Sequence, residues 1–167
     1  KNTKVEIQYI RQGKTKNATI ILDDVEIKAV PFFSLLKDNT GYIVLTKFTE
    51  KASFETKAAL LELKKQGATK IILDLRGNPG GLLHEAVNIC NLFVPKNELI
   101  VTTKSKNPKH NLEYRTKNEP IDLEIPIAVI VDGKSASASE IVAGAIQDLD
   151  RGVILGTRSF GKGLVQR

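Results

Sequence analysis

Residues 70–81 have the sequence Lys70-Ile71-Ile72-Leu73-Asp74-Leu75-Arg76-Gly77-Asn78-Pro79-Gly80-Gly81. The first six residues form a short apolar run, which predicts a buried strand. The Gly, Asn and Pro residues that follow predict a turn. Residues 82–93 then place apolar side chains at helical spacing, which predicts a helix with one buried face. The segment therefore predicts a strand, a glycine-rich turn and a helix, and the amides of Gly80 and Gly81 either face an anion or simply connect the two elements.

The same succession returns at residues 126–149. Residues 126–132 predict a fully buried strand, and residues 137–149 predict a helix with a single apolar stripe. Between them lies Ser135-Ala136-Ser137-Ala138-Ser139-Glu140. A serine at a helix N-terminus lies beside unpaired backbone N–H groups, which stabilise negative charge such as the oxyanion of acyl transfer. Ser137 and Glu140 also match a capping box, in which the serine only caps the helix, so both interpretations stay open.

A lysine between two glycines, Lys162, follows a short predicted strand at residues 153–155. A serine hydroxyl is a weak nucleophile and needs a base, and a lysine can serve as one when burial favours its neutral form. A solvated loop lysine is the alternative. The glycines do not form a phosphate-binding loop, because no Gly-x-x-x-x-Gly-Lys-Ser/Thr sequence occurs.

The remaining elements extend this alternation of strands and helices. A helix is predicted at residues 53–66, with Ser53 as its cap and Phe54, Ala58 and Leu61 on its buried face. The alternation favours a layered α/β fold with a largely parallel sheet flanked by helices. Both turns follow the carboxyl ends of strands, where open α/β sheets form their sites. The other predicted strands are an N-terminal hairpin (residues 5–11 and 18–22), residues 25–30, residues 41–47, and residues 99–103 and 112–116, which flank a polar surface loop at 104–111.

The composition is that of an ordinary globular domain. The chain has 167 residues, of which 41% are hydrophobic and 26% charged, so it is long enough to bury a core. The net charge is +6, but the basic residues are dispersed, and aromatic residues make up 5% without interleaving with them. This pattern argues against nucleic-acid binding. No run of about 18 apolar residues occurs, so no membrane span is predicted.

The cysteine and histidine residues limit which kinds of catalytic or metal site the chain can form. Cys90 is the single cysteine, so no internal disulfide can form, and its place on an apolar helix face predicts a buried structural thiol. A Ser-His-Asp triad would have to use His84 or His110, and His84 directly follows the glycine-rich turn. No metal-ligand spacing occurs, so we expect neither a metal nor another cofactor.

Three segments, taken together and in this order, resemble the C-terminal processing proteases, also called tail-specific proteases. The matching segments are residues 74–81, 135–148 and 156–166, with a weaker match at residues 41–48. The resemblance implies a serine-type peptidase, an endopeptidase that cleaves proteins near their C-termini through a Ser-Lys catalytic pair and an acyl-enzyme intermediate. It also implies a fold related to the crotonase and Clp-protease folds.

Carried over by position, the resemblance implies a role for each site residue. Ser137 is the nucleophile, Lys162 is the general base, and Gln166 orients the lysine. The backbone amides of Gly81 and Ala138 form the oxyanion hole. The two serines that flank the nucleophile stay capping or packing residues.

The resemblance also shapes the expected domains and partners. Residues 1–22 look like the closing strands of a PDZ-like domain, and residues 23–167 look like the protease core. Family members continue with further strands beyond the position of Arg167, so the chain looks like an excerpt of a longer protein. The expected substrates are unfolded proteins or C-terminal peptides, in an extracytoplasmic location (periplasm or cell envelope). The resemblance allows membrane association and homo-oligomers.

Two other functions stay open. A crotonase-like acyl-CoA enzyme would share the α/β layers and an oxyanion hole but would not need a pair formed by Ser137 and Lys162. A non-catalytic peptide-binding module would keep the motifs with a solvated, charged lysine.

Overall fold

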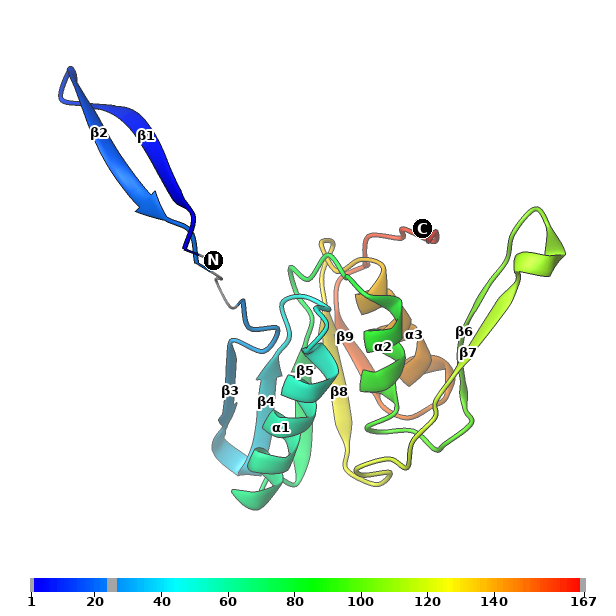
Figure 1. Cartoon of the computed structure of the whole chain (residues 1–167). Coiled ribbons are helices and arrows are strands. Elements are labelled where there is room, and N and C mark those ends of the chain that lie inside the picture. The colour runs from blue at the N-terminus through cyan, green and yellow to red at the C-terminus, as the bar shows by residue number, and fades with distance from the viewer. Residues whose placement is uncertain (1, 24–26, 166–167) are drawn as a thin grey trace.

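A computed structural model of the chain describes residues 2–23 and 27–165 (Figure 1). Within these residues the main sheet consists, in spatial order, of five strands: β3 (Phe32–Leu35), β4 (Thr40–Val44), β5 (Lys70–Asp74), β8 (Ile127–Val131) and β9 (Val153–Gly156). A short 3-10 turn, η1 (Lys37–Asn39), connects β3 to β4, which are antiparallel. The other neighbouring pairs are parallel. The prediction of a largely parallel sheet is therefore confirmed, as a mixed sheet with an antiparallel edge strand.

A helix joins each parallel pair: α1 (Ala52–Lys65) follows β4, α2 (Leu83–Cys90) follows β5, and α3 (Ala138–Asp148) follows β8. Such strand–helix–strand crossovers are right-handed, and the sheet order advances in one direction from β4 to β9. The three helices therefore cover the same face of the sheet, where α1 contacts α2 and α2 contacts α3 (Figure 1).

The two faces of the sheet are covered unequally. In β8, every second residue from Ile127 to Val131 is buried, and the two residues between them are partly exposed. The prediction that residues 126–132 are fully buried is therefore wrong. At β8 the face under the helices is buried, and the opposite face keeps some contact with solvent.

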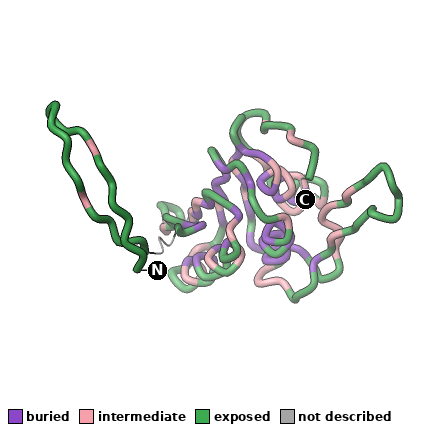
Figure 2. Tube along the Cα trace, turned by 45° about the horizontal axis from the view of Figure 1, so that its top comes forward, coloured by how far each residue is buried: buried purple, intermediate pink, exposed green. Residues whose placement is uncertain are grey.

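Two antiparallel hairpins lie outside the main sheet. At the N-terminus, β1 (Lys4–Arg11) pairs with β2 (Lys14–Ile21), which confirms the predicted hairpin, and it is exposed along nearly its whole length (Figure 2). The second hairpin consists of β6 (Leu99–Thr103) and β7 (Leu112–Arg115), with the 3-10 turn η2 (Pro108–His110) at its end. It lies beside α2 and α3, so these two predicted strands form without joining the main sheet.

The described part of the strand predicted at residues 25–30 is not a strand (residues 24–26 lie outside the described residues). The N–H of Val30 donates to Glu55 Oε2 at 2.9 Å. The backbone N–H of Val30 is therefore bound to a side chain of α1 and is not available for a hydrogen bond to a neighbouring strand. The edge strand β3 begins only after Pro31.

The helix predicted at residues 53–66 forms but buries a different face. Phe54 is 72% exposed and Leu61 is 46% exposed, whereas Leu60 and Leu63 are fully buried. Two apolar stripes compete on this helix. The stripe that contacts β4 is the one that is buried.

The cap predicted for α1 is also wrong. Lys51 occupies the N-cap position, and Ser53 lies inside the first turn. The N–H of Ser53 donates to Glu85 Oε2 at 2.6 Å. Glu85 is buried on α2, so a carboxylate from another helix caps the N-terminus of α1.

The core lies between the sheet and the three helices, where the buried residues gather (Figure 2). Cys90 is fully buried in this core, which confirms its predicted structural place. Burial raises the pKa of Cys90 to about 12, so the thiol stays protonated at neutral pH and is a poor nucleophile. Within the described ranges, no helix is long and apolar enough to cross a membrane.

Candidate active site

The glycine turn (residues 76–81) and the serine turn (residues 132–137) lie side by side because they follow neighbouring parallel strands. The ladder between β5 and β8 continues one residue further, where Leu75 donates its N–H to Ile130 O at 2.9 Å. The prediction that both turns lie at the carboxyl edge of the sheet is therefore confirmed.

The three serines around the start of α3 have two different roles. Ser135 Oγ donates to Leu75 O at 2.8 Å, and Ser139 Oγ donates to Asn78 O at 2.9 Å. Both of these outer serines are fully buried. They attach the serine turn to the glycine turn, whereas Ser137 between them is partly exposed. The outer serines are therefore structural, as the sequence predicted.

Ser137 has an unusual backbone conformation. Its φ is 58° and its ψ is −115°, a region that residues with a Cβ rarely occupy. Strain of this kind costs about 1–3 kcal/mol and is found most often at functional sites, where the surrounding structure imposes it. This strained strand-to-helix turn places Ser137 among the residues that line a groove.

The lysine loop (residues 157–165) follows β9 and returns to the serine turn. Thr157 donates its N–H to Val131 O at 3.2 Å, which continues the ladder with β8. Phe160 donates its N–H to Ser135 O at 3.0 Å. These two bonds bring the loop to the start of α3.

Glu140, in the first turn of α3, connects the candidate nucleophile to the lysine loop. Its Oε2 accepts from the N–H of Ser137 at 2.8 Å and from the N–H of Lys162 at 3.1 Å. Its Oε1 accepts from the N–H of Gly161 at 2.6 Å and from Ser159 Oγ at 2.8 Å. A single carboxylate therefore holds the backbone of both candidate catalytic residues.

These contacts also set the charge of Glu140. Burial raises its pKa, but the hydrogen bonds from Ser159, Gly161, Ser137 and Lys162 outweigh burial, so the net pKa lies below its ordinary value. The carboxylate is therefore ionised at neutral pH. The capping box predicted at Ser137 and Glu140 is present, and Glu140 Oε2 accepts from the N–H of Ser137 as part of it.

Lys162 and Ser137 line the same groove. Lys162 is partly exposed, and within the described residues no hydrogen bond joins its Nζ to Ser137 Oγ. The structure thus brings the two residues to one cavity through their backbones. Gln166 lies outside the described residues, so its predicted orienting role stays a prediction.

The N–H groups of Gly81 and Ala138, the predicted oxyanion hole, have no acceptor within the described part of the chain. Phe48 donates its N–H to Gly80 O at 3.1 Å and accepts from the N–H of Leu82 at 2.9 Å. In such a parallel bridge the residue between these partners, Gly81, turns its own N–H away from Phe48. Gly81 also lines the groove, and its role in an oxyanion hole stays a prediction.

Gly80 sets the contact between the two turns. Its φ is 98°, and a Cβ at this position would lie 2.6 Å from Ala136 O and 2.8 Å from Ser137 Cβ. We expect Gly80→Ala to lower the free energy of unfolding by about 2–4 kcal/mol, because a buried turn must move and the backbone stays strained. Urea unfolding followed by circular dichroism measures this change.

Gly144 in α3 provides the control for that experiment. A Cβ at Gly144 would meet nothing within 4 Å, and alanine is the better helix former. Gly144→Ala should therefore leave stability unchanged or raise it by about 1 kcal/mol. Equal stability of Gly80→Ala and Gly144→Ala would show that the two turns do not pack as tightly as the distances indicate.

The groove has a volume of about 1140 Å³. Its walls come from the glycine turn, α3, the lysine loop and the hairpin of β6 and β7. This exceeds the usual volume of a small-molecule pocket and suits a stretch of extended polypeptide. Part of the lining is apolar: Leu82, Leu83, Ile100, Ile141 and Ala145.

Sequence reasoning missed the contribution of the second hairpin. Thr103, Lys104, Ser105 and His110 line the groove, although residues 104–111 were expected to form a polar surface loop. No local pattern connects this loop to the serine turn. The close spacing of Lys104, Lys106 and Lys109, within a chain whose basic residues are otherwise dispersed, was the one visible signal.

His84 does not take part in the site. Its side chain is 64% exposed, and its Nε2 lies 3.9 Å from Glu85 Oε1. It is not among the residues that line the groove. No group of three His, Cys, Asp or Glu side chains within the described ranges is placed to hold a metal ion.

A buried aspartate fixes the start of the glycine turn. Asp74 accepts from the hydroxyl of Tyr42, from Arg76 Nη2 at 2.6 Å and from the N–H of Arg76 at 2.9 Å. Burial raises the pKa of Asp74, but the bonds from Arg76 and Tyr42 outweigh it and hold the pKa below its ordinary value. The roles that the sequence left open for Asp74 and Arg76 are thus to pair and to support this turn.

A second aspartate, Asp132, connects the turns from the serine side. Its Oδ1 accepts from the N–H groups of Gly77 at 3.0 Å, Lys134 at 2.9 Å and Ser135 at 3.1 Å. The bond from Gly77 is the main cause that lowers the pKa of Asp132. Both turns are therefore held by ionised carboxylates that accept from backbone N–H groups.

Two relatives match nearly the whole chain. A "probable CtpA-like serine protease" of Staphylococcus saprophyticus subsp. saprophyticus is 35% identical over 164 residues, which is 98% of this chain and 33% of that protein. A protein of the same name from Staphylococcus aureus is 36% identical over 167 residues, 99% of this chain and 33% of that protein. The chain thus spans a third of the length of these relatives.

Solved structures share the architecture. A photosystem II D1 C-terminal processing protease is 31% identical and superposes with a TM-score of 0.73, over 99% of this chain and 46% of that one. A lipoprotein from Streptococcus agalactiae, at 19% identity and a TM-score of 0.62, shares the fold over 83% of this chain and 53% of its own. The family model of peptidase family S41 matches residues 39–167, which include the glycine turn, the serine turn and the lysine loop. The chain therefore belongs to peptidase family S41.

Proposed function

We propose that this chain is the core of a serine endopeptidase that cleaves proteins near their C-termini, with Ser137 as the nucleophile and Lys162 as the general base. The observation that carries the proposal is the carboxylate of Glu140, which binds the backbone of both residues and directs them to one groove. Family membership and the serine protease name of the relatives support peptide-bond hydrolysis. A similar structure named for C-terminal processing supports the preferred position of the cut.

In the acylation step, the neutral amine of Lys162 takes the proton of Ser137 Oγ while the oxygen attacks the scissile carbonyl carbon. A bond forms between Oγ and carbon, and the carbonyl electron pair moves to the oxygen. The N–H groups of Gly81 and Ala138 donate to this oxyanion. When the carbonyl re-forms, the C–N bond breaks, and the leaving amine takes the proton from Lys162.

In the deacylation step, a water molecule attacks the ester carbon of the acyl-enzyme, and Lys162 takes its proton. The second tetrahedral intermediate is stabilised by the same two amides. Its collapse breaks the bond to Ser137 Oγ, which regains its proton from Lys162. Gln166 keeps the lysine side chain oriented through both steps.

The shape of the site supports a peptide substrate over an acyl-CoA. The groove has residues of α3 and of the second hairpin in its lining and a volume of about 1140 Å³, enough for an unfolded or C-terminal segment in an extended form. The family match also favours a peptidase over the crotonase-like alternative.

The N-terminal hairpin fits the proposed domain division, in which residues 1–22 close a PDZ-like domain and residues 23–167 form the protease core. One face of the hairpin is apolar and exposed: Val5 is 37%, Ile7 is 38% and Ile20 is 45% exposed. A face of this kind needs a partner surface, which further strands of such a domain would provide.

An active-site serine probe tests the nucleophile directly. We expect a fluorophosphonate to label the full-length protein at Ser137, because this serine alone among the three combines exposure to the groove with neighbouring N–H donors. Peptide mapping by mass spectrometry locates the label, and Ser137→Ala should remove it together with the cleavage of an unfolded protein substrate. The buried Ser135 and Ser139 serve as internal controls that stay unlabelled.

A non-catalytic peptide-binding module would give the opposite result. It would bind a peptide but show neither labelling nor cleavage. If the probe still labelled the Ser137→Ala variant, the nucleophile would be another serine.

A further inference from the structure

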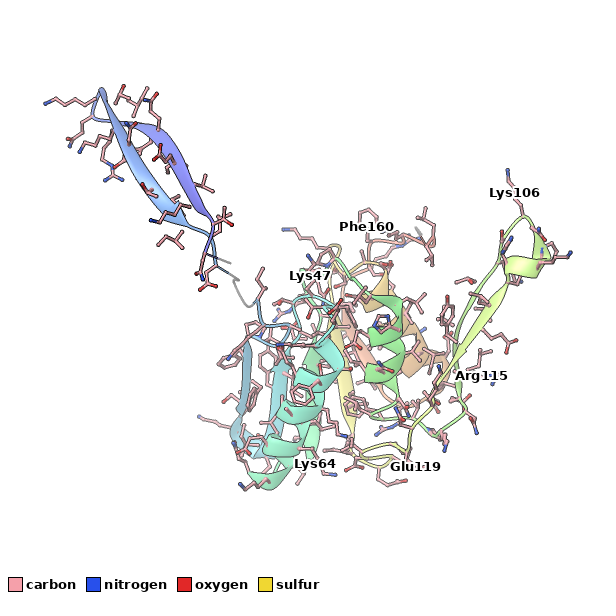
Figure 3. The ribbon with its side chains drawn as sticks, viewed as in Figure 1. Lys47, Lys64, Lys106, Arg115, Glu119 and Phe160 are labelled. Carbon is pink, nitrogen blue, oxygen red and sulfur yellow. The ribbon has the colours of Figure 1, made fainter. Side chains whose placement is uncertain are left out.

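The loop at the end of the second hairpin concentrates positive charge. We call residues 104–110 the basic loop; it carries Lys104, Lys106, Lys109 and His110, all of them exposed. Within the described residues, none of the four forms an ion pair with a carboxylate. Figure 3 shows Lys106 at the far end of the hairpin, pointing away from the body of the molecule.

The basic loop is held by its own hydrogen bonds. Asn111 Oδ1 accepts from the N–H of Ser105 at 2.8 Å, which closes the base of the loop. Asn107 Oδ1 accepts from the N–H of Lys109 at 3.1 Å, and Asn107 O accepts from the N–H of His110 at 2.9 Å. Because these bonds already order the loop, it loses little conformational entropy when it binds a partner.

The basic loop is continuous with the candidate active site. Lys104 and His110 line the same groove as Ser137 and Lys162. The acidic groups of this lining are Glu140, whose oxygens already accept four hydrogen bonds, and Asp148 near the end of α3. Lys104 and Lys162 therefore balance these two carboxylates in formal charge, and the excess positive charge lies on Lys106 and Lys109, in the part of the basic loop beyond the groove lining.

We propose that the basic loop binds an acidic stretch of the peptide substrate and so selects substrates that carry Asp or Glu on the side of the cut that lies along the second hairpin. This inference rests on the proposed function, because it names the substrate class of the same site. An acidic peptide is favoured over a nucleic acid or a lipid surface because Lys104 of the basic loop lines the groove itself, which a peptide enters to be cut. The loop contains no Phe, Tyr or Trp side chain on which a base could stack.

The test compares two fluorogenic peptides with the full-length protein. The peptides are identical around the cut, and at positions that reach the hairpin one carries three Asp residues and the other three Asn residues. We expect the KM of the acidic peptide to be roughly tenfold lower at low salt, and the difference to shrink at 0.5 M NaCl because salt screens exposed charges.

Two triple variants locate the effect. Lys104→Gln/Lys106→Gln/Lys109→Gln should raise the KM of the acidic peptide roughly tenfold, to that of the Asn peptide. The control, Lys37→Gln/Lys57→Gln/Lys65→Gln, removes the same charge from exposed positions outside the groove and should keep the wild-type KM ratio.

The outcomes separate this inference from the proposed function. Equal KM values for both peptides, with cleavage that Ser137→Ala abolishes, would overturn the role of the basic loop and leave the peptidase intact. Cleavage that persists in Ser137→Ala, or no cleavage at all, would overturn the proposed function and the inference with it. A loop variant that loses binding to phosphatidylserine vesicles or single-stranded DNA, with the peptide KM ratio unchanged, would identify another class of partner.

Discussion

Lys162→Ala is expected to reduce the kcat/KM for an unfolded protein substrate by about 10⁴-fold. The structure holds the backbone of Lys162 at the groove through Glu140, so the truncation removes the amine and leaves the loop in place. Without a base, Ser137 Oγ remains protonated and attacks poorly. Initial rates of cleavage by the full-length protein, compared between wild type and variant, measure the effect.

Lys134→Ala is the matched control for this prediction. Lys134 is an exposed lysine of the serine turn that does not line the groove, and its contact with Asp132 uses the backbone N–H, which the substitution keeps. Its activity should stay within about twofold of wild type, as surface substitutions usually do. Full activity of Lys162→Ala would place the base elsewhere, and His110 would be tested next because, unlike His84, it lines the groove.

Glu140→Ala is expected to lower kcat by about 10²-fold, with a smaller change in KM. The substitution removes the acceptor of four donors, so the lysine loop loses its attachment to α3 and Lys162 leaves its position. Glu140 is thus a positioning residue. Hydrogen–deuterium exchange of residues 157–165 should rise in Glu140→Ala and stay at the wild-type level in Lys162→Ala.

The charge of Glu140 gives this prediction a pH dependence. Its pKa is lowered in the folded protein from the ordinary value of 4.5, so its contribution to stability is fully present above pH 4.5. That contribution is lost as the pH falls through the lower, folded value. Exchange of the lysine loop should therefore rise at acidic pH in wild type, and this rise should be absent from Glu140→Gln.

Glu119→Ala serves as the control for both arms of the experiment. Glu119, labelled in Figure 3, is exposed and does not line the groove, and its Oε1 lies 3.5 Å from Lys96 Nζ. Its loss should change neither kcat nor exchange of the lysine loop. Unchanged exchange in Glu140→Ala would mean that the bonds from Thr157 and Phe160 suffice to hold the loop.

The alternation of strands and helices was predictable because it depends on neighbours along the chain. The apolar run at residues 70–75 and the helical spacing after the glycine turn are local patterns, and both produced the expected elements. Ser137 was recognisable as a nucleophile candidate for the same reason, since it stands at the start of a helix. Parallel pairing of β5 and β8 then placed the two turns together.

Errors arose where two local patterns competed. On α1, both the stripe of Phe54 and Leu61 and the stripe of Leu60 and Leu63 have helical spacing, and contact with the sheet chose the second. Ser53 resembled a cap, but the carboxylate of Glu85 took that role from another helix. Local propensity is too weak to overcome such tertiary contacts.

The sequence alone established the order of elements, the α/β class and the three motifs of the candidate site. It could not show that Glu140 holds the lysine loop, because a capping box looks the same whether or not residues 19 to 22 positions further along the chain donate to it. Nor could it show that the basic loop lines the groove. Both facts depend on groups that come into contact only when segments far apart in the sequence pack together. The free energy of such packing depends on the whole fold, so no short stretch of sequence reveals it.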